Sequence, residues 1–146
     1  MSRRLRWASG RLWIALALWT AVDSPADQET WLDYEPTVVT LSGKVIERHE
    51  FGPPYYGEHP EIDDKLVIQI LQLPSPISVR ADPSDDLNTE ETGLREIQLA
   101  FPSGLHHDHL SGKCVAARGT LYHATSGYHF TNVLLWVSEA NEIDCP

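Results

Sequence analysis

Apolar and polar residues alternate with a period of two in much of the chain between residues 37 and 138, the pattern typical of β-strands. One segment, KLVIQILQL, is apolar on both faces, as expected of a strand covered on both sides. A short helix is predicted over Ser103–Leu110. The predicted strands are Thr37–Glu47, Lys65–Leu73, Arg95–Phe101, Lys113–His123 and Asn132–Ser138. The pattern therefore predicts an all-β domain with one short helix.

The order of these elements favours one architecture over another. Three strands, a short helix and a final hairpin is the order of a small five-stranded OB-like barrel, which is partly open. Gly43 and Gly119 fall inside strand patterns, where glycine often marks a bulge or a tightly coiled strand. The alternative is a small β-sandwich, which usually needs about seven strands. Five strands are predicted, so the barrel is the preferred interpretation.

Two long connections interrupt the strand pattern, at residues 50–64 and 81–93. Each contains five acidic residues and shows neither helical nor strand periodicity. Both are long for a compact domain, so we interpret them either as functional loops or as solvated ones. The acids of the second loop lack the spacing of an EF-hand, so a specific calcium site is not expected there.

The first residues of the chain have the features of a secretory signal peptide. Four arginines and no acid precede the apolar run Leu12–Trp19, and Ser24-Pro25-Ala26 supplies small residues for cleavage. The apolar run has about half of the ~20 residues that span a bilayer. A core helix or a membrane anchor is the alternative. We therefore predict a signal peptide at 1–26, a single mature domain at 27–146, and a periplasmic or secreted protein without membrane insertion after cleavage.

Charge excludes several classes of partner. The 146 residues carry 11 Lys and Arg against 21 Asp and Glu, a net charge of −10. Removal of residues 1–26 leaves seven basic and twenty acidic residues, a net charge of −13. Nucleic-acid binding is not expected, because contacts to phosphates need Lys or Arg. Anionic membrane surfaces are disfavoured for the same reason.

The chain has only two cysteines, Cys114 and Cys145, too few for a Cys-rich zinc module. In an oxidising compartment two cysteines of a small domain usually pair. Their disulfide would attach the C-terminal segment to the domain and stabilise it by about 3 kcal/mol in the chain-entropy model. The alternative is a free buried thiol and a frayed C-terminal segment.

Several short motifs of the mature chain occur together in a known family. They are Tyr34-Glu35-Pro36, Leu41-Ser42-Gly43, Phe51-Gly52-Pro53-Pro54-Tyr55, Pro76-Ile77-Ser78-Val79, Glu96-Ile97-Gln98-Leu99, Leu110-Ser111-Gly112-Lys113 and Gly119-Thr120-Leu121-Tyr122-His123-Ala124. With them the chain resembles, from about Tyr34 to Val137, the uncharacterised bacterial family catalogued as domain of unknown function 4431. The resemblance implies a small exported bacterial β domain and no established activity.

Histidines suggest a metal site, and the resemblance bears on it. The family's final hairpin is expected to be rich in histidine, whereas Thr125, Tyr128 and Phe130 stand here at such positions. Imidazole is a common ligand of zinc, copper and nickel. The candidate metal ligands are His106, His109, His123 and His129, with His107 beside them. Surface histidines without a tight metal site are nevertheless the preferred interpretation, because a two-residue turn at Ser126-Gly127 would place His123 and His129 on opposite faces.

Tyrosines suggest a ligand-binding surface. Pro53-Pro54-Tyr55-Tyr56 lies in the first long loop, with Trp31 and Tyr34 upstream and Tyr128 in the last hairpin. In OB-folds the loop after the first strand borders the ligand face, and exposed aromatic rings there stack on bases or sugars. The candidates for a ligand face are Tyr55, Tyr56 and Tyr128. Packing of these rings over the mouth of the barrel is the interpretation that the negative charge of the surrounding loop favours.

The function that these observations favour is non-catalytic. The sequence lacks a Gly-x-Ser-x-Gly nucleophile motif and a His-Glu-x-x-His metal motif, so we predict that the protein is not an enzyme and needs no cofactor. The preferred interpretation is an exported binding module that holds a protein or a small molecule at the loop face of the barrel. The alternatives are a histidine-based metal-binding or metal-handling protein, and an acidic inhibitor or immunity-type protein that masks a basic partner.

Overall fold

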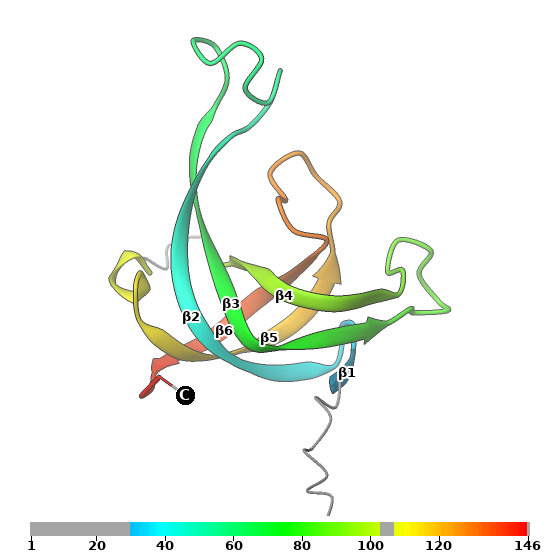
Figure 1. Cartoon of the computed structure of the whole chain (residues 1–146). Helices are drawn as coiled ribbons and strands as arrows, with labels where there is room; N and C mark the ends of the chain where they lie inside the picture. The colour runs from blue at the N-terminus through cyan, green and yellow to red at the C-terminus, as the bar shows by residue number, and fades with distance from the viewer. Residues whose placement is uncertain (1–29, 103–106, 146) are drawn as a thin grey trace, which may run out of the picture.

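β-Strands make up most of the chain in the computed structural model, which describes residues 30–102 and 107–145 (Figure 1). The elements are β1 (Thr30–Asp33), β2 (Val38–Phe51), β3 (Lys65–Arg80), β4 (Glu91–Ala100), a 3-10 turn η1 (Asp108–Leu110), β5 (Cys114–His123) and β6 (Val133–Glu142). The prediction of an all-β domain is confirmed. Residues 1–26, the predicted signal peptide, lie outside the described residues.

Five of the strands form a closed circuit of hydrogen-bonded pairs. β2 is antiparallel to both β3 and β5, and β5 is antiparallel to β6. β4 is antiparallel to β3 and parallel to β6, which completes the circuit β3–β2–β5–β6–β4–β3. β1 lies outside it and pairs in parallel with the end of β3.

The hydrophobic core lies on one face of these strands. Alternate residues of β2, among them Leu41 and Val45, are buried, as the period of two predicts. They belong to one apolar cluster with residues of every other strand of the circuit, for example Leu71, Ile97, Val115 and Leu135. The opposite face is apolar in part, since Ile70 and Leu134 are also fully buried there, and it carries Gln98 of the site described below.

Several strands differ from the sequence-based prediction: β2 and β6 end four residues later and β4 begins four residues earlier, but β1 and β3 differ most. β1 was not predicted, because four residues are too few to show a period. β3 continues beyond Leu73 through Pro74 and Pro76. The β3–β4 register shifts between Gln72 and Ile77, and the prolines lie within this irregularity, where a missing N–H breaks no regular ladder.

The connections also differ in part. Of the predicted helix Ser103–Leu110, the described residues form only η1, and residues 103–106 lie outside the described chain. β5 and β6 are joined by residues 124–132 and not by a two-residue turn at Ser126-Gly127. The long loops are present, at residues 52–64 between β2 and β3 and at residues 81–90 between β3 and β4.

The two glycines inside strands lie where neighbouring backbones approach closely. A Cβ on Gly43 would overlap the carbonyl oxygen of Gln72, and a Cβ on Gly119 would overlap that of Trp136. The β5–β6 register also shifts between Arg118 and Gly119, which is the bulge expected at that glycine.

Cys114 and Cys145 lie at disulfide-bonding distance, with their Cα atoms 5.2 Å apart. This pair attaches the segment after β6 to the first residue of β5. In the part of the chain that the structure describes, none of the helical segments is long and apolar enough to cross a membrane.

Candidate functional site

The candidate site is formed by two loops that lie next to each other at one end of the molecule. The β2–β3 hairpin projects beyond the rest of the sheet and carries loop 52–64, and the β5–β6 loop 124–132 stands beside it (Figure 1). We call the surface formed by these two loops the loop face. Strands that are far apart in the sequence thus bring together loops separated by some sixty residues.

Loop 52–64 is organised around the side chain of Asp63. This carboxylate is buried and accepts hydrogen bonds from the backbone N–H groups of Tyr55 (2.7 Å), Gly57 (2.8 Å) and His59 (3.3 Å). Burial alone raises the pKa of Asp63, but the three N–H donors and the nearby His59 outweigh it, so the pKa lies below its ordinary value. The loop is therefore built around a carboxylate that stays ionised.

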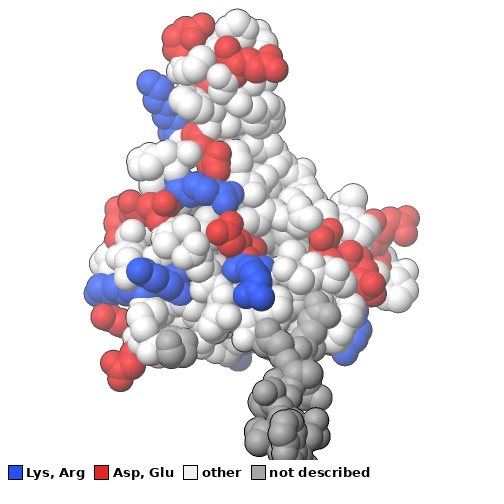
Figure 2. All heavy atoms as spheres, viewed as in Figure 1, with Lys and Arg blue, Asp and Glu red and all other residues white. Residues whose placement is uncertain are grey.

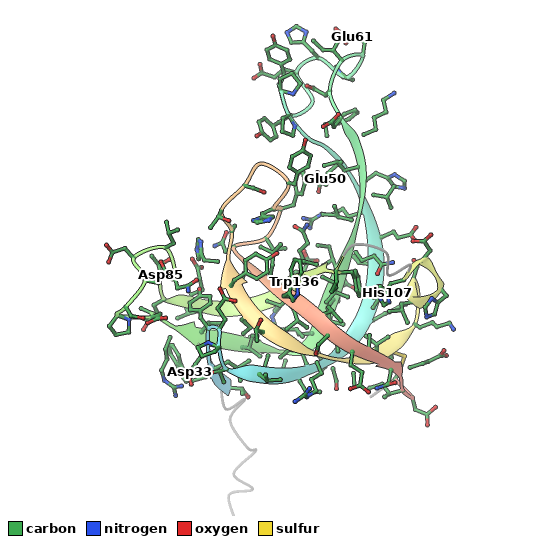
Figure 3. All side chains as sticks on the ribbon, turned by 180° about the vertical axis from the view of Figure 1, so that it is seen from behind. Asp33, Glu50, Glu61, Asp85, His107 and Trp136 are labelled. Atoms are coloured by element: carbon green, nitrogen blue, oxygen red, sulfur yellow. A yellow bond between two sulfur atoms is a disulfide. The ribbon has the colours of Figure 1, made fainter. Side chains whose placement is uncertain are left out.

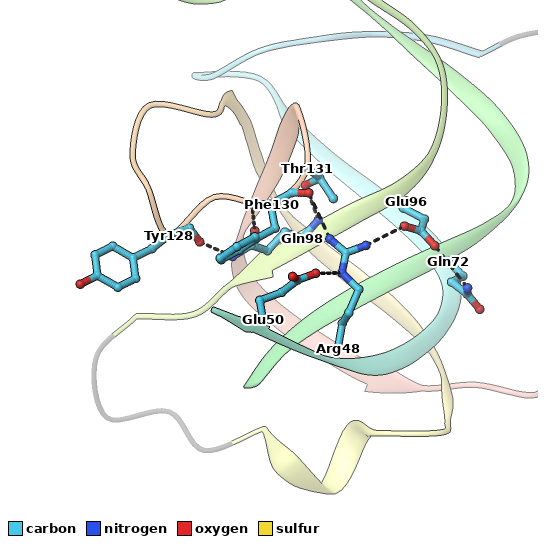
Figure 4. A network of polar contacts seen from close by, with 8 residues as sticks. All are labelled: Arg48, Glu50, Gln72, Glu96, Gln98, Tyr128, Phe130 and Thr131. Atoms are coloured by element: carbon cyan, nitrogen blue, oxygen red, sulfur yellow. Dashed lines mark hydrogen bonds and ion pairs between the residues drawn. The ribbon is translucent and has the colours of Figure 1, made fainter. Parts of the chain in front are cut away.

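Loop 124–132 is held on the sheet by Gln98 of β4, a buried residue (Figure 4). The Gln98 amide donates to the carbonyl of Tyr128 at 3.0 Å and accepts from the N–H of Phe130 at 2.7 Å. The backbone N–H of Gln98 donates to the hydroxyl of Thr131 at 3.0 Å. One side chain therefore satisfies two backbone groups of the loop and fixes its position relative to β4.

Arg48 of β2 adds a charged link to the same loop (Figure 4). Its guanidinium lies 2.6 Å from a carboxylate oxygen of Glu50 and 3.0 Å from one of Glu96, and it donates to the carbonyl of Phe130 at 3.1 Å. Two acids neutralise the single cation, and the remaining donor reaches the loop backbone. This network joins β2, β4 and loop 124–132.

The two loops also contact each other directly. The hydroxyl of Tyr128 donates to the carboxylate of Asp64 at 2.8 Å, a bond that raises the pKa of Tyr128 together with the charge of Asp64. On the other side, a Cβ on Gly127 would overlap the hydroxyl of Tyr56, so this glycine leaves the space that the ring occupies. The loop face is therefore one connected surface.

Aromatic rings and acids dominate the exposed part of this surface. Tyr55, Tyr56 and Tyr128 are exposed by 45%, 53% and 47%. Acidic side chains gather at the tip of the β2–β3 hairpin (Figure 2), where Glu61 is labelled in Figure 3. Tyrosine offers an apolar ring and a hydroxyl that donates and accepts hydrogen bonds, so such a surface suits stacking and hydrogen bonding to a ligand.

The structure brings Tyr55, Tyr56 and Tyr128 to one surface but separates them from the two upstream aromatic residues. Tyr34 is buried in the core, and its hydroxyl donates to the carbonyl of Thr89 at 2.7 Å. Burial, and the nearby charge of Glu91, raise the pKa of Tyr34 to about 12. Trp31 belongs to β1, where its ring lies 5.8 Å from the guanidinium of Arg80.

The candidate metal ligands are distributed over two regions. His109 is exposed in η1, before β5 begins, whereas His123 ends β5, a strand of ten residues with a length of about 30 Å. His129 follows in loop 124–132, and His106 lies outside the described residues. The structure therefore does not bring His109 next to His123.

His123 and His129 have structural partners of their own. The Nε2 atom of His123 lies 3.0 Å from a carboxylate oxygen of Glu91. The Nδ1 atom of His129 accepts hydrogen bonds from the backbone N–H groups of Thr125 (2.9 Å) and Ser126 (3.3 Å). Within residues 30–102 and 107–145, the structure contains no group of three or more His, Cys, Asp or Glu side chains that could hold a metal ion.

Loop 81–90, the second acidic loop, is organised by its own acids. Asp82 accepts hydrogen bonds from the backbone N–H and the hydroxyl of Ser84, which lower the pKa of its carboxyl. Asp85 accepts from the N–H of Leu87 at 3.0 Å. These short-range bonds give the loop its turns, and loop 81–90 takes no part in the loop face.

Two residues of the site were not identified from the sequence, Arg48 and Gln98. Gln98 stands at an outward position of a predicted strand, where a polar residue is ordinary, and Arg48 lies just beyond the predicted strand Thr37–Glu47. Their partners are 32 and 82 residues away along the chain. Burial of Gln98 on the outward face would have indicated a structural role. That burial depends on the position of loop 124–132, which the sequence does not reveal.

Comparison with known proteins finds a family resemblance for part of the chain. The model of the family described as domain of unknown function (DUF4431) matches residues 96–141, so the chain resembles that family over this segment. The segment contains Gln98 and the whole of loop 124–132, whereas the motifs between Tyr34 and Val79 lie outside it. No curated protein and no solved structure matches the chain.

Proposed function

We propose that the protein is an exported, non-catalytic binding module that holds a protein or a small molecule at the loop face. The observation that carries this proposal is the joining of loops 52–64 and 124–132 by the bond between Tyr128 and Asp64. Three tyrosines remain about half exposed on a surface that is otherwise held in place by Asp63, Gln98 and Arg48. Such preorganisation lowers the entropy cost of binding.

The polar groups of the loop face support a binding role in preference to a catalytic one. Asp63 and Gln98 direct their side-chain atoms to backbone groups of the two loops. Arg48 is neutralised by two acids. These groups hold the loops in place, and the exposed aromatic rings are what a ligand would meet.

We further propose that the sheet is a small OB-like barrel with β1 as an addition to it. The closed circuit of pairs and the parallel pairing of β4 with β6 support this interpretation. In OB-folds the loop between the first two strands and the loop between the last two flank the ligand face. With β2 as the first strand, these would be loops 52–64 and 124–132.

Export is the third part of the proposal. It is supported by the arginine-rich start, the short apolar run and the small residues before residue 27. The pair Cys114 and Cys145 adds support, since disulfides persist mainly outside the cytoplasm. Mass spectrometry of the protein from the cell envelope should find a chain that begins near Asp27, whereas an intact start at Met1 would contradict export.

A capture experiment tests the binding function. Immobilised protein should retain a partner from envelope extract, and the double variant Tyr55→Ala/Tyr56→Ala should lose it. Leu87→Ala is the control, because Leu87 is even more exposed than Tyr55 and Tyr56 but lies on loop 81–90. If the double variant retains the partner, or if Leu87→Ala loses it to the same extent, the loop face is not the binding site.

A second candidate function follows from the acids at the hairpin tip, which favour a basic partner. The same capture, repeated from low to high salt, separates the two functions. Steep loss of the partner with salt would indicate that the protein masks a basic surface. Retention at high salt would indicate binding by the tyrosine rings.

A further inference from the structure

A pocket lies on the outer face of β5 and β6, beside loop 124–132, which supplies His129 to its lining. It has a volume of about 340 Å³ and is lined by Glu35, Tyr122, His129 and Trp136. Figure 3 shows Trp136 over the central part of the sheet. None of the proposals made above for the loop face uses these four side chains.

Strand register explains why the two larger rings lie together. Trp136 pairs with Thr120, and Tyr122, two residues further along β5, pairs with Leu134. Tyr122 and Trp136 are therefore diagonal neighbours on one face of an antiparallel pair, with backbones about 7–8 Å apart. Trp136 is 47% exposed and lines the pocket, so part of its side chain is available to a ligand.

His129 completes the aromatic lining and contributes no positive charge. Its ring meets the ring of Tyr122 edge-on, with 5.6 Å between the ring centroids. Its Nδ1 atom accepts two backbone N–H groups, which requires an unprotonated nitrogen, and burial lowers the pKa of His129. The pocket therefore has three uncharged aromatic rings.

Glu35 supplies the charge of the pocket. Its backbone N–H donates to the carbonyl of Leu121 at 2.8 Å, which holds the residue beside the end of β5. The carboxylate is close enough to Tyr122 to contribute to the raised pKa of that hydroxyl, whose main cause is burial. Among the described residues, no Lys or Arg lines the pocket.

We propose that this pocket binds the ammonium group of a lysine side chain from a partner protein. Aromatic faces attract a cation through their quadrupole, with Trp the strongest, and a carboxylate gives the ammonium a charge-assisted hydrogen bond. The strongly acidic chain would also attract a lysine-rich partner. The capture experiment on the loop face substitutes only Tyr55 and Tyr56, neither of which lines the pocket, so this inference stands or fails separately from the proposed function.

The test is an NMR titration of the purified protein with Nα-acetyl-lysine N-methylamide. The indole N–H signal of Trp136 should shift and saturate. The norleucine analogue, which has the same aliphatic chain without the ammonium, should produce no saturable shift. Glu35→Gln should weaken binding of the lysine probe roughly tenfold, the loss of one charge-assisted contact.

Matched variants keep the test specific. Glu139→Gln removes one acid from the same strand as Trp136 but outside the pocket, so binding should stay within about twofold of the wild type. Trp136→Leu should also lose about tenfold. Because Glu35 is exposed, Glu35→Gln leaves the core intact and decides the result even if Trp136→Leu impairs folding.

Three outcomes would overturn the proposal. The first is equal binding of the norleucine analogue, and the second is an effect of Glu35→Gln no larger than that of Glu139→Gln. The third is saturation by a neutral hexose or by tetramethylammonium under conditions where the lysine probe does not bind. The hexose would identify a sugar platform, and tetramethylammonium would identify a pocket for small quaternary amines.

Discussion

Gly119 lies where the backbone of β6 leaves no room for a side chain. A Cβ at this position would overlap the carbonyl oxygen of Trp136 and press on Val137, both of which are backbone contacts. We therefore expect Gly119→Ala to lower the free energy of unfolding by about 1–3 kcal/mol, the range for overpacked positions. Urea denaturation followed by circular dichroism measures this loss.

Gly127→Ala is the matched control for that substitution. A Cβ on Gly127 would meet only the hydroxyl end of Tyr56, an exposed side chain that can turn away. The loss of stability should therefore be smaller than for Gly119→Ala. Equal losses in the two variants would show that close backbone approach is not what makes Gly119 necessary.

His129 should make loop 124–132 sensitive to acid. Burial lowers the pKa of His129 in the folded protein below the unfolded value of about 6.5, so the unfolded chain binds more protons in that range. The stabilisation that comes from neutral His129 is complete above the pKa of His129 in the unfolded chain. It decreases as the pH falls through the pKa of His129 in the folded protein. Protonation would also remove the acceptor for Thr125 and Ser126.

The measurement is the midpoint of thermal unfolding at pH 7.5 and at pH 5, in the wild type and in His129→Asn. The midpoint of the wild type should fall more than that of the variant, whose amide does not titrate. His109→Asn is the control, since His109 is exposed. If all three proteins lose the same amount, His129 does not couple the loop to pH.

At the scale of elements, Gln98 connects β4 to loop 124–132. Gln98→Ala would remove the partners of the Tyr128 carbonyl and the Phe130 N–H, so we expect a loss of about 1–3 kcal/mol in the free energy of unfolding. Hydrogen exchange at the Phe130 amide should accelerate by more than that of the strand amides. Gln72→Ala is the control, because among the described residues the Gln72 side chain makes one hydrogen bond, an exposed contact of 3.4 Å to Glu96. Unchanged exchange at Phe130 would contradict this role of Gln98.

Much of the strand content could be predicted because burial on one face imposes a period of two. β2, β5 and β6 follow that period and were recognised. β1 was missed, since four residues carry too little pattern, and β3 was ended too early at Pro74. A proline ends a strand only where the ladder requires a backbone N–H at that position, because proline has none. The β3–β4 register shift removes that requirement at Pro74 and Pro76.

The candidate site could be predicted in composition but not in geometry. Tyr55, Tyr56 and Tyr128 were predicted as candidates for a ligand face; the structure leaves all three exposed, and ligand binding there stays a prediction. Their proximity depends on strand pairing and on the bond between Tyr128 and Asp64, two residues that are 64 positions apart. The pocket around Trp136 was not recognised, because its four residues come from four separate parts of the chain: the connection after β1, β5, loop 124–132 and β6.

At the scale of the whole molecule, the pair Cys114 and Cys145 restrains the segment after β6. Breaking the disulfide should lower the free energy of unfolding by about 3 kcal/mol, mainly because the unfolded chain gains freedom. Cys145→Ser tests this, since residue 145 is exposed and serine there needs no buried partner. Dithiothreitol should destabilise the wild type to the level of the variant and leave the variant unchanged. A wild type that does not respond to dithiothreitol would show that the two cysteines are not bonded in solution.

The closed circuit of strand pairs has a consequence for biosynthesis. β6 pairs with both β5 and β4, so the circuit cannot close until the ribosome has made β6. Before that point β4 and β5 each have one of their two neighbouring strands and lack the other, β6. The core is then also incomplete, because β6 contributes apolar residues to it. The nascent chain is therefore expected to stay unfolded through most of its synthesis. A polypeptide that folds so late remains unfolded during synthesis. An unfolded chain can pass through a translocation channel that is too narrow for the folded domain.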